Sequence, residues 1–361
     1  MSNKRILFVC PYPFDEAPSQ RFRFEQYLAI LKENGYSYQL KPFFSLYMWR
    51  ILYKKGKVIS KAFGIFIAYI KRFFLLFTLH KYAFIFIHRE ATPAGPPFFE
   101  WATKYIWKKK IIYDFDDAIW LEDPNETGTF KSTLKWKKKV KKICNWSYKI
   151  SCGNQYLANY ASQFNKRVVV NPTTLDTENL HKISINNTEL QSKTKVTIGW
   201  TGTHTTLQYL QDVIPALEAL ELKYDFSFLV ISNQKPDFNL KSLKFIAWNK
   251  TTEIQDLDLI DIGIMPLSND IWSKGKCGFK ALQYMALAKP VIASPVGVNE
   301  IIVEDNVSGL HAETKEDWIN ALEKLLQDEA LSIKMGLKGL QKVEKYYTVK
   351  SNKNNFLSLF Q

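Results

Sequence analysis

The chain has 361 residues, enough for two domains, and its 46% hydrophobic and 23% charged residues exclude a disordered protein. Its 49 basic and 35 acidic residues give a formal charge of +14, which predicts an anionic partner: nucleic acid, a membrane surface or a phosphorylated substrate. The four cysteines show no CxxC spacing, and the first apolar run, Ile6–Cys10, is too short for a signal-peptide core. We therefore expect a cytoplasmic protein without a disulfide framework or a metal cluster.

The first half of the chain predicts a parallel sheet, because its apolar runs are short and continuous. The expected strands are Arg5–Cys10, Tyr82–Ile87, Lys110–Tyr113, Ser147–Ser151 and Val168–Val170. Ligands bind at the carboxyl ends of such strands, and the candidates there are Ser19, Gln20, Arg21 and Arg23 after the first strand and His88 and Arg89 after the second. For the two arginines at 21 and 23, solvated helix positions are the alternative.

The most unusual composition lies in residues 34–89, where no acidic residue occurs. Basic residues alternate there with two apolar blocks, Ala62–Ile70 and Phe73–Leu79, which Lys71 and Arg72 separate. Neither block approaches the roughly 20 residues of a membrane-spanning helix, so we expect the stretch to lie on an anionic membrane and not to cross it. Ordinary helices that cover the domain, with a solvated basic side, are the alternative.

Three carboxylates follow the strand at 110–113: Asp114, Asp116 and Asp117. A cluster of this kind is one signature of a divalent cation site. The alternative is direct contact with a ligand, with the neutralising positive charge supplied by lysines elsewhere in the chain.

The second half of the chain predicts another parallel sheet. Its expected strands are Val196–Trp200, Phe226–Ile231, Leu243–Ala247, Leu259–Met265 and Val291–Ala293. After the first of them, Gly202 and His204 precede a helix whose free amides suit an anion. An exposed histidine in a capping loop is the alternative. Trp248 follows the third strand.

The stretch 275–299, GKCGFKALQYMALAKPVIASPVGVN, reads as loop, helix, buried strand and loop. Gly275 and Gly278 free the backbone ahead of an apolar-periodic helix that begins near Phe279. The first amides of a helix lack intrahelical partners, so this helix start suits an anion.

Three lysines, Lys274, Lys276 and Lys280, surround the same helix start, where the dipole already favours a phosphate group. Lys280 and Gln283 lie three residues apart on one helix surface, so a cation and an amide face one ligand together. The pattern predicts a phosphate-binding site.

This whole run resembles the donor-binding segment of the group 1 glycosyltransferases with the GT-B fold. Members carry two glutamates, separated by seven residues, before a Met-Ala and a Lys-Pro-Val-Ile pattern, and Met285-Ala286 and Lys289–Ile292 match it. Gly275 and Gln283 take the places of the glutamates, which fits a subgroup with a Gly-Lys-Cys-x-Phe-Lys-x-x-Gln motif. Looser matches extend the resemblance over nearly the whole chain.

The resemblance implies an α/β protein of the GT-B class, with two Rossmann-like doubly wound domains that face an interdomain cleft. We place an acceptor-side domain at 1–176, with a basic membrane-contacting insertion at 34–89, and a linker at 177–195. A nucleotide-sugar-binding domain follows at 196–340, and a C-terminal helix at 341–361 returns to the first domain.

The resemblance also implies transfer of a hexosyl unit from a UDP- or GDP-linked sugar to a glycan or lipid-linked acceptor. We expect retention of configuration, a role in cell-envelope polysaccharide or glycolipid synthesis, no metal, and no cofactor because the nucleotide-sugar is a substrate. The implied catalytic residues are Asp116, Asp117 and Lys280. The implied donor-binding residues are Gly202, His204, Trp248, Lys274, Lys276, Gly278, Phe279, Lys280 and Gln283. The implied acceptor-side residues are Ser19, Gln20, Arg21, Arg23, His88 and Arg89.

Two other classes compete with this interpretation. The basic charge permits a nucleic-acid-binding protein, but the sequence contains no recognisable binding module and its aromatic residues sit in apolar blocks, so we expect no nucleic-acid partner. The missing glutamate pair permits a catalytically inactive GT-B scaffold. We favour an active transferase, cytoplasmic and associated peripherally with the inner face of the cell membrane.

Overall fold

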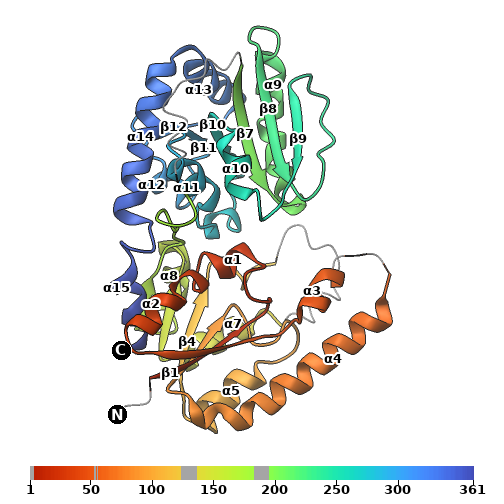
Figure 1. The fold of residues 1–361 in the computed structure, drawn as a ribbon, viewed down its shortest axis with the longest axis vertical. Coiled ribbons are helices and arrows are strands. Elements are labelled where there is room, and N and C mark those ends of the chain that lie inside the picture. The colour runs from red at the N-terminus through yellow and green to blue at the C-terminus, as the bar shows by residue number, and fades with distance from the viewer. Residues whose placement is uncertain (1–3, 53, 55, 123–135, 183–194) are drawn as a thin grey trace. The chain divides into compact units, whose positions relative to one another are not determined.

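The computed structural model describes residues 4–52, 54, 56–122, 136–182 and 195–361. They divide into two compact domains, shown in Figure 1: residues 1–173 together with 352–361, and residues 174–351. The expected linker at 177–195 lies largely outside the described residues.

The first domain is built on a sheet of six parallel strands. Their order is β2 (Ser37–Pro42), β1 (Arg5–Cys10), β3 (Phe84–His88), β4 (Lys110–Phe115), β5 (Lys149–Cys152) and β6 (Val168–Val170). The central strands β1, β3 and β4 are almost fully buried, which explains why they read as uninterrupted apolar runs.

The second domain contains a second sheet of six parallel strands. Their order is β12 (Gly309–His311), β11 (Val291–Ala293), β10 (Ile262–Met265), β7 (Val196–Gly202), β8 (Phe226–Ser232) and β9 (Leu243–Ala247). The core of this domain packs Trp200 and Phe228 of the sheet against Trp318 of a covering helix.

Helices connect the strands of both sheets. In the first domain they are α1 (Pro18–Arg21), α2 (Leu28–Glu33), α3 (Leu46–Leu52), α4 (Val58–Leu75), α5 (Phe98–Tyr105), α7 (Lys139–Trp146), α8 (Gln155–Ser162), α15 (Lys353–Leu357) and the 3-10 segments η1 (Glu25–Tyr27), η2 (Leu76–Lys81) and η6 (Ser358–Phe360). In the second domain they are α9 (Ile214–Leu220), α10 (Glu253–Asp258), α11 (Phe279–Ala286), α12 (Asn299–Ile302), α13 (Lys315–Gln327), α14 (Glu329–Tyr346) and the 3-10 segments η4 (His204–Asp212) and η5 (Ser273–Gly275).

The last ten residues, 352–361, belong to the first domain and complete its core. The ring of Phe356 stacks on Tyr27 with centroids 4.2 Å apart, and Phe360 packs 6.2 Å from Phe86. The C-terminal helix expected at 341–361 is therefore shorter in the structure, because α14 stays with the second domain as far as its end at Tyr346.

Two short strands escaped the sequence prediction. β2 lies at the edge of its sheet and is half-exposed, so Tyr38 and Leu40 alternate with polar residues and form no apolar run. β12 has three residues, too few for a periodicity. From the sequence we expect an insertion at 34–89, but this stretch contains β2 and β3, which are strands of the main sheet. Only the helical part between these two strands is therefore an insertion.

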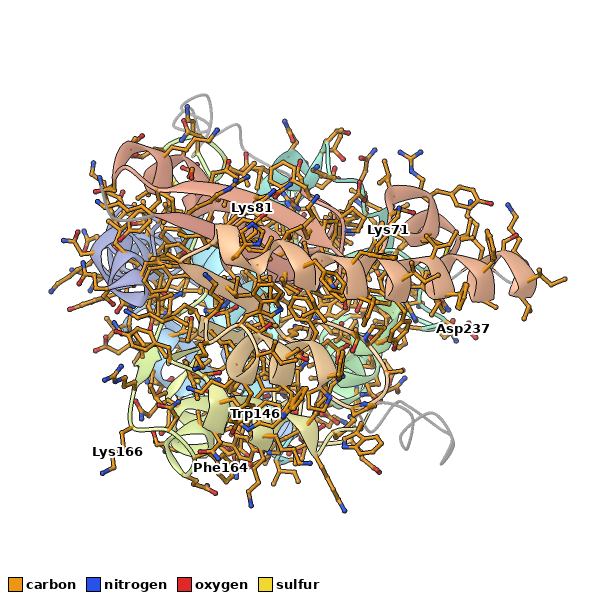
Figure 2. All side chains as sticks on the ribbon, turned by 90° about the horizontal axis from the view of Figure 1, so that it is seen from below. Lys71, Lys81, Trp146, Phe164, Lys166 and Asp237 are labelled. Carbon is orange, nitrogen blue, oxygen red and sulfur yellow. The ribbon has the colours of Figure 1, made fainter. Side chains whose placement is uncertain are left out.

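The two apolar blocks expected at 62–70 and 73–79 form one continuous helical segment, Val58–Lys81, instead of two. Arg72 does not interrupt it, because its buried guanidinium donates hydrogen bonds to the carbonyl oxygens of Lys41 and Cys10 at 2.9 and 3.4 Å. By length and composition alone, these 24 residues suffice to cross a membrane, which corrects the expectation that no such stretch occurs. Figure 2 looks onto the side of the first domain along which α4 runs.

Candidate functional site

The loop 274–278 and the start of α11 have the geometry that the sequence predicted. Gly278 adopts a left-handed backbone with φ of 67°, which favours glycine, and a Cβ there would lie 2.2 Å from Cδ1 of Ile302. α11 begins at Phe279 with no side-chain cap, and its dipole favours an anion at this end.

Lys276 and Lys280 are held at this helix start by aromatic rings. The ammonium of Lys276 lies 5.1 Å from the ring centroid of Trp272, and that of Lys280 lies 5.4 Å from the ring of Trp200. Such cation–π contacts restrict each ammonium without neutralising its charge. Both lysines are half-buried, as is Lys274.

The side chain of Gln283 lies on α11 and is 3% exposed. A carboxamide carries both donors and an acceptor, so a ligand bound at the helix start can donate to it and accept from it. The neighbouring Tyr284 fixes α11 against the sheet, because its hydroxyl accepts a hydrogen bond of 2.8 Å from the backbone amide of Thr201.

Two residues near this loop were not among the predicted site residues. Gly297, with φ of 59°, brings the turn after β11 against the loop, since a Cβ there would lie 2.9 Å from the carbonyl oxygen of Lys274. Asn299 is fully buried, and its side-chain oxygen has no hydrogen-bond partner within the described chain. Sequence periodicity gives no signal for such contacts between loops.

His204 and Trp248 lie at the same edge of the second sheet as the loop 274–278, because all of these segments follow the carboxyl ends of parallel strands. The backbone amide of His204 donates to Oδ1 of Asn233 at 2.7 Å, and its ring Nδ1 lies 3.0 Å from Nδ2 of the same side chain. Asn233, which the sequence did not single out, thus orients His204. Gly202 has no room for a Cβ, which would lie 2.4 Å from the Trp200 ring.

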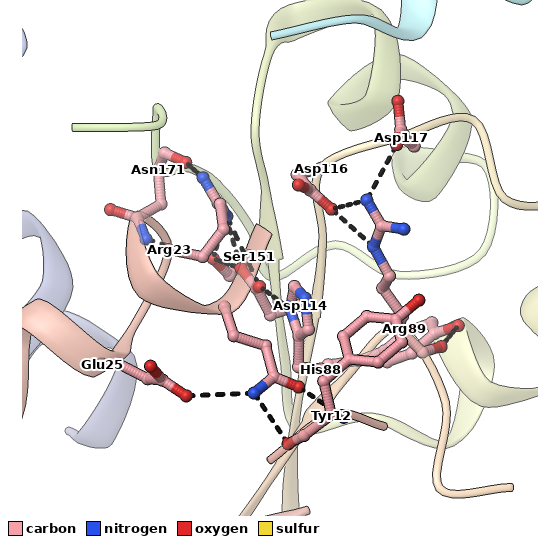
Figure 3. A network of polar contacts seen from close by, with 12 residues as sticks. Tyr12, Arg23, Glu25, His88, Arg89, Asp114, Asp116, Asp117, Ser151 and Asn171 are labelled. Carbon is pink, nitrogen blue, oxygen red and sulfur yellow. Dashed lines mark hydrogen bonds and ion pairs between the residues drawn. The ribbon is translucent and has the colours of Figure 1, made fainter. Parts of the chain in front are cut away.

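At the corresponding edge of the first sheet, a buried polar network surrounds Asp114 (Figure 3). Arg23 donates to both carboxylate oxygens of Asp114, and Nδ1 of His88 lies 2.8 Å from Oδ2. Ser151 donates to Oδ1 at 2.6 Å, and Arg23 also donates to the backbone carbonyl of Asn171. Burial alone would raise the pKa of Asp114, but Arg23 and His88 hold it well below its usual range.

This network changes the interpretation of two predicted acceptor-side residues. Arg23 and His88 have fully buried side chains that connect β3 and β4 to the segment after α1 through Asp114. Nε2 of His88 is buried without a hydrogen-bond partner in the described part of the chain. Asp114, Ser151 and Asn171 are network members that the sequence did not assign.

Arg89 clamps the two predicted catalytic aspartates. Its Nε donates to Asp116 and its Nη2 to Asp117, each at 2.8 Å, and its backbone has a φ of 58°. Asp116 and Asp117 keep partly exposed side chains. Asp114 in β4 and Asp116 and Asp117 after it are therefore all ion-paired to arginines of the protein, and the described residues contain no group of three metal-ligating side chains.

The remaining candidates lie on α1. Gln20 is fully buried and pins the turn after β1, exchanging hydrogen bonds of 2.8 and 3.0 Å with the backbone of Tyr12 and donating to Glu25 at 3.0 Å. Arg21 forms an ion pair of 3.3 Å with Asp15. Ser19 is half-buried. Gln20 thus stabilises the turn after β1, and the acceptor-side role of the three side chains stays a prediction.

Residues 195–328 match the family model described as "Glycosyl transferases group 1". A curated D-inositol 3-phosphate glycosyltransferase from Corynebacterium aurimucosum is 37% identical over 78 residues, which is 21% of this chain and 17% of that relative. The chain thus matches a small part of that relative's length.

Solved structures resemble the chain over nearly its full length. A glycosyltransferase from Rickettsia africae ESF-5 aligns with a TM-score of 0.70 and 13% identity, covering 100% of this chain and 98% of that one. Sucrose-phosphate synthase from Thermosynechococcus elongatus gives 0.69 and 12%, covering 99% and 98%. HepE from Anabaena, solved with UDP-glucose, gives 0.65 and 13%, covering 98% and 99%.

The predicted fold is confirmed: the two Rossmann-like domains are those of the GT-B class. The segment 195–328, which matches the model of the group 1 glycosyltransferases, contains the loop 274–278 and Gln283.

Replacing Asp114 by asparagine should lower the free energy of unfolding of the first domain by about 3 to 5 kcal/mol, because it leaves the buried Arg23 guanidinium without its counter-charge. Hydrogen exchange of the amides in β4 measures this stability. The matched control Glu33→Gln neutralises an exposed carboxylate of the same domain and should change little. Equal protection in both variants would show that the ion pair contributes nothing.

Glu25 and Asp114 make the stability of the first domain depend on pH in opposite directions, because the pKa of Glu25 is raised and that of Asp114 is lowered. Burial raises the pKa of Glu25 from 4.5 to about 7, against hydrogen bonds from Asp15 and Gln20. Between these two values the folded state holds a proton that the unfolded state has lost, so the free energy of unfolding falls as the pH rises through this window. The contribution of Asp114 changes at a lower pH than this window. Because the pKa of Asp114 is depressed in the folded state, its contribution to the free energy of unfolding is lost only as the pH falls below about 4.

The variant Glu25→Gln should remove the contribution of Glu25, so its difference in unfolding free energy from the wild type should change between about pH 5 and 7.5. Urea unfolding across that range measures the difference, and Glu33→Gln is again the control. An unchanged slope in Glu25→Gln would mean that Glu25 titrates normally in the folded protein.

Proposed function

We propose that the protein is a hexosyltransferase that binds a nucleotide-sugar at the loop 274–278 and the start of α11. One observation carries the proposal: a helix start with two ring-held lysines lies next to the buried side chain of Gln283, inside the segment that matches the glycosyltransferase family. The helix dipole and the lysines suit a diphosphate, and the amide suits a ribose hydroxyl.

The proposed chemistry is transfer of the sugar to an acceptor hydroxyl of a glycan or lipid-linked molecule. Negative charge grows on the leaving diphosphate in the transition state, and Lys276 and Lys280 are placed to stabilise it. We assign Asp116 to the transferred sugar. Because Arg89 donates hydrogen bonds to Asp116 and Asp117, these carboxylates are held in position.

We further propose that the reaction retains configuration and needs no divalent metal. Retention is supported by the resemblance of the 275–283 motif to the retaining group. Metal independence is supported by the ion pairs of Asp114, Asp116 and Asp117 with arginines of the protein. The fold likeness to HepE, solved with UDP and UDP-glucose, makes UDP the first nucleotide to test. Four free cysteines, three of them buried, support a cytoplasmic location.

The test is a binding and transfer assay with UDP- and GDP-sugars in the presence and absence of EDTA. Binding stabilises the folded state and raises its melting temperature, so a thermal-shift panel identifies the donor. The anomeric configuration of the transferred sugar then decides retention. Donor binding without transfer or hydrolysis would favour an inactive scaffold, and loss of binding in EDTA would overturn metal independence.

Residue variants assign the site. Lys280→Ala should weaken nucleotide binding by about 1.5 to 3 kcal/mol through loss of a charge-assisted contact, and Gln283→Ala by roughly 1 kcal/mol through an unmade hydrogen bond. Gln283→Glu should fold and keep part of the affinity. Calorimetric titration with UDP measures all three.

The control for these variants is Gln255→Ala, on the exposed side of α10 in the same domain, which should bind as the wild type does. If Gln283→Ala bound the nucleotide as tightly as this control, Gln283 would not contact the ribose.

A further inference from the structure

The outer side of α4 carries an apolar stripe in place of a polar one. Ile59, Phe63, Phe66 and Phe74 are 87, 64, 60 and 63% exposed, and Ile70, Phe73 and Phe77 lie between and beyond them, also exposed. Spacings of three and four residues place them on one helix face. An apolar stripe of this length on a soluble surface normally has an occupant.

The opposite side of α4 is also apolar, and it is already occupied. Ala68 and Leu75 are buried, and α3 packs so closely that a Cβ on Gly64 would lie 2.0 Å from Sδ of Met48. The helix therefore covers the domain with one face and leaves the other for a second apolar environment.

A neighbouring helix extends the exposed surface. The guanidinium of Arg72 lies 5.7 Å from the ring of Phe99, which joins α4 to α5. On α5, Phe98, Trp101 and Tyr105 are exposed at helical spacing, with consecutive rings 5.8 and 6.2 Å apart. Aromatic side chains of this kind favour the interface between lipid headgroups and acyl chains.

The charge around the stripe identifies the occupant. Exposed lysines accompany it at 54, 57, 71, 81 and 104, and Figure 2 labels Lys71 on α4 and Lys81 at the end of η2. Across α3, α4, η2 and α5, the one acidic residue is Glu100, whose side chain is buried. A surface that combines exposed aromatic rings with positive charge alone complements an anionic lipid headgroup layer.

The attachment of α4 to its domain decides its orientation. Arg72 donates to Lys41 and Cys10, and its guanidinium lies near the rings of both Phe43 and Phe99. To span a bilayer, the helix would have to break these contacts and bring the guanidinium into hydrocarbon, which is costly. The helix instead lies in the plane of the membrane with only its outer stripe inserted.

We propose that the exposed face of α4 and α5 docks the enzyme on an anionic membrane, with α4 parallel to the surface. This proposal stands independently of the donor assignment, because the proposed donor residues lie in the other domain.

Co-sedimentation of the full chain with vesicles of phosphatidylcholine, alone or mixed with phosphatidylglycerol, tests the proposal. Binding should require phosphatidylglycerol and fall as salt rises, since screening shortens the reach of the lysines. The triple variant Phe63→Ser, Phe66→Ser, Phe74→Ser should reduce the vesicle partition coefficient at least about tenfold, because three inserted rings are lost. The control is a triple variant that removes exposed apolar residues of the second domain and should bind vesicles normally: Leu222→Ser, Ile333→Ser, Leu337→Ser.

Three further measurements separate the alternatives. Bound protein should be released by alkaline carbonate, whereas resistance to it would mean that α4 spans the bilayer. A triple variant of the first domain, Lys57→Gln, Lys71→Gln, Lys81→Gln, should lose the preference for phosphatidylglycerol. The matched control, a triple variant of the second domain with Lys315→Gln, Lys334→Gln, Lys338→Gln, should keep it. Light scattering of the wild type and the Phe→Ser variant tests a subunit interface. If the wild type were a dimer, the variant a monomer, and the variant bound vesicles normally, the stripe would be a subunit interface and the membrane proposal would fail.

Discussion

The strands of each sheet run parallel to one another, so in each domain their carboxyl ends lie at a single edge. Backbone carbonyls and loop side chains collect there, because no hairpin returns the chain at that end. In the first domain this edge holds His88, Asp114 and Ser151, and in the second it holds His204 and the loop before α11. The positions of nearly all the candidate functional residues follow from this pairing.

The two domains use positive charge differently at these edges. Arg23 donates hydrogen bonds to Asp114 and to the backbone carbonyl of Asn171, so its charge is neutralised inside the protein. Lys276 and Lys280 rest over aromatic faces, which attract a cation but carry no net charge. A mobile lysine would lose side-chain entropy on binding an anion, and the rings of Trp272 and Trp200 reduce that loss before the ligand arrives.

The sequence predicted what depends on local pattern. Apolar runs located the buried strands, and two glycines with three lysines located the helix start at Phe279. It did not predict what depends on long-range packing. The partners Arg23 and Asp114 lie 91 residues apart, and the edge strand β2 acquires its register only from β1. The charge of Arg72 indicated a break in α4, whereas carbonyls from distant segments accept its hydrogen bonds and allow the helix to continue.

The core of the first domain has a consequence for biosynthesis. Phe356 and Phe360 fill space between Tyr27 and Phe86, yet these residues leave the ribosome only after the whole of 174–351 has been made. A nascent first domain therefore carries an open gap in its interior while the second domain emerges. The second domain can fold first, and the earlier-made domain then closes last, around the residues at 352–361.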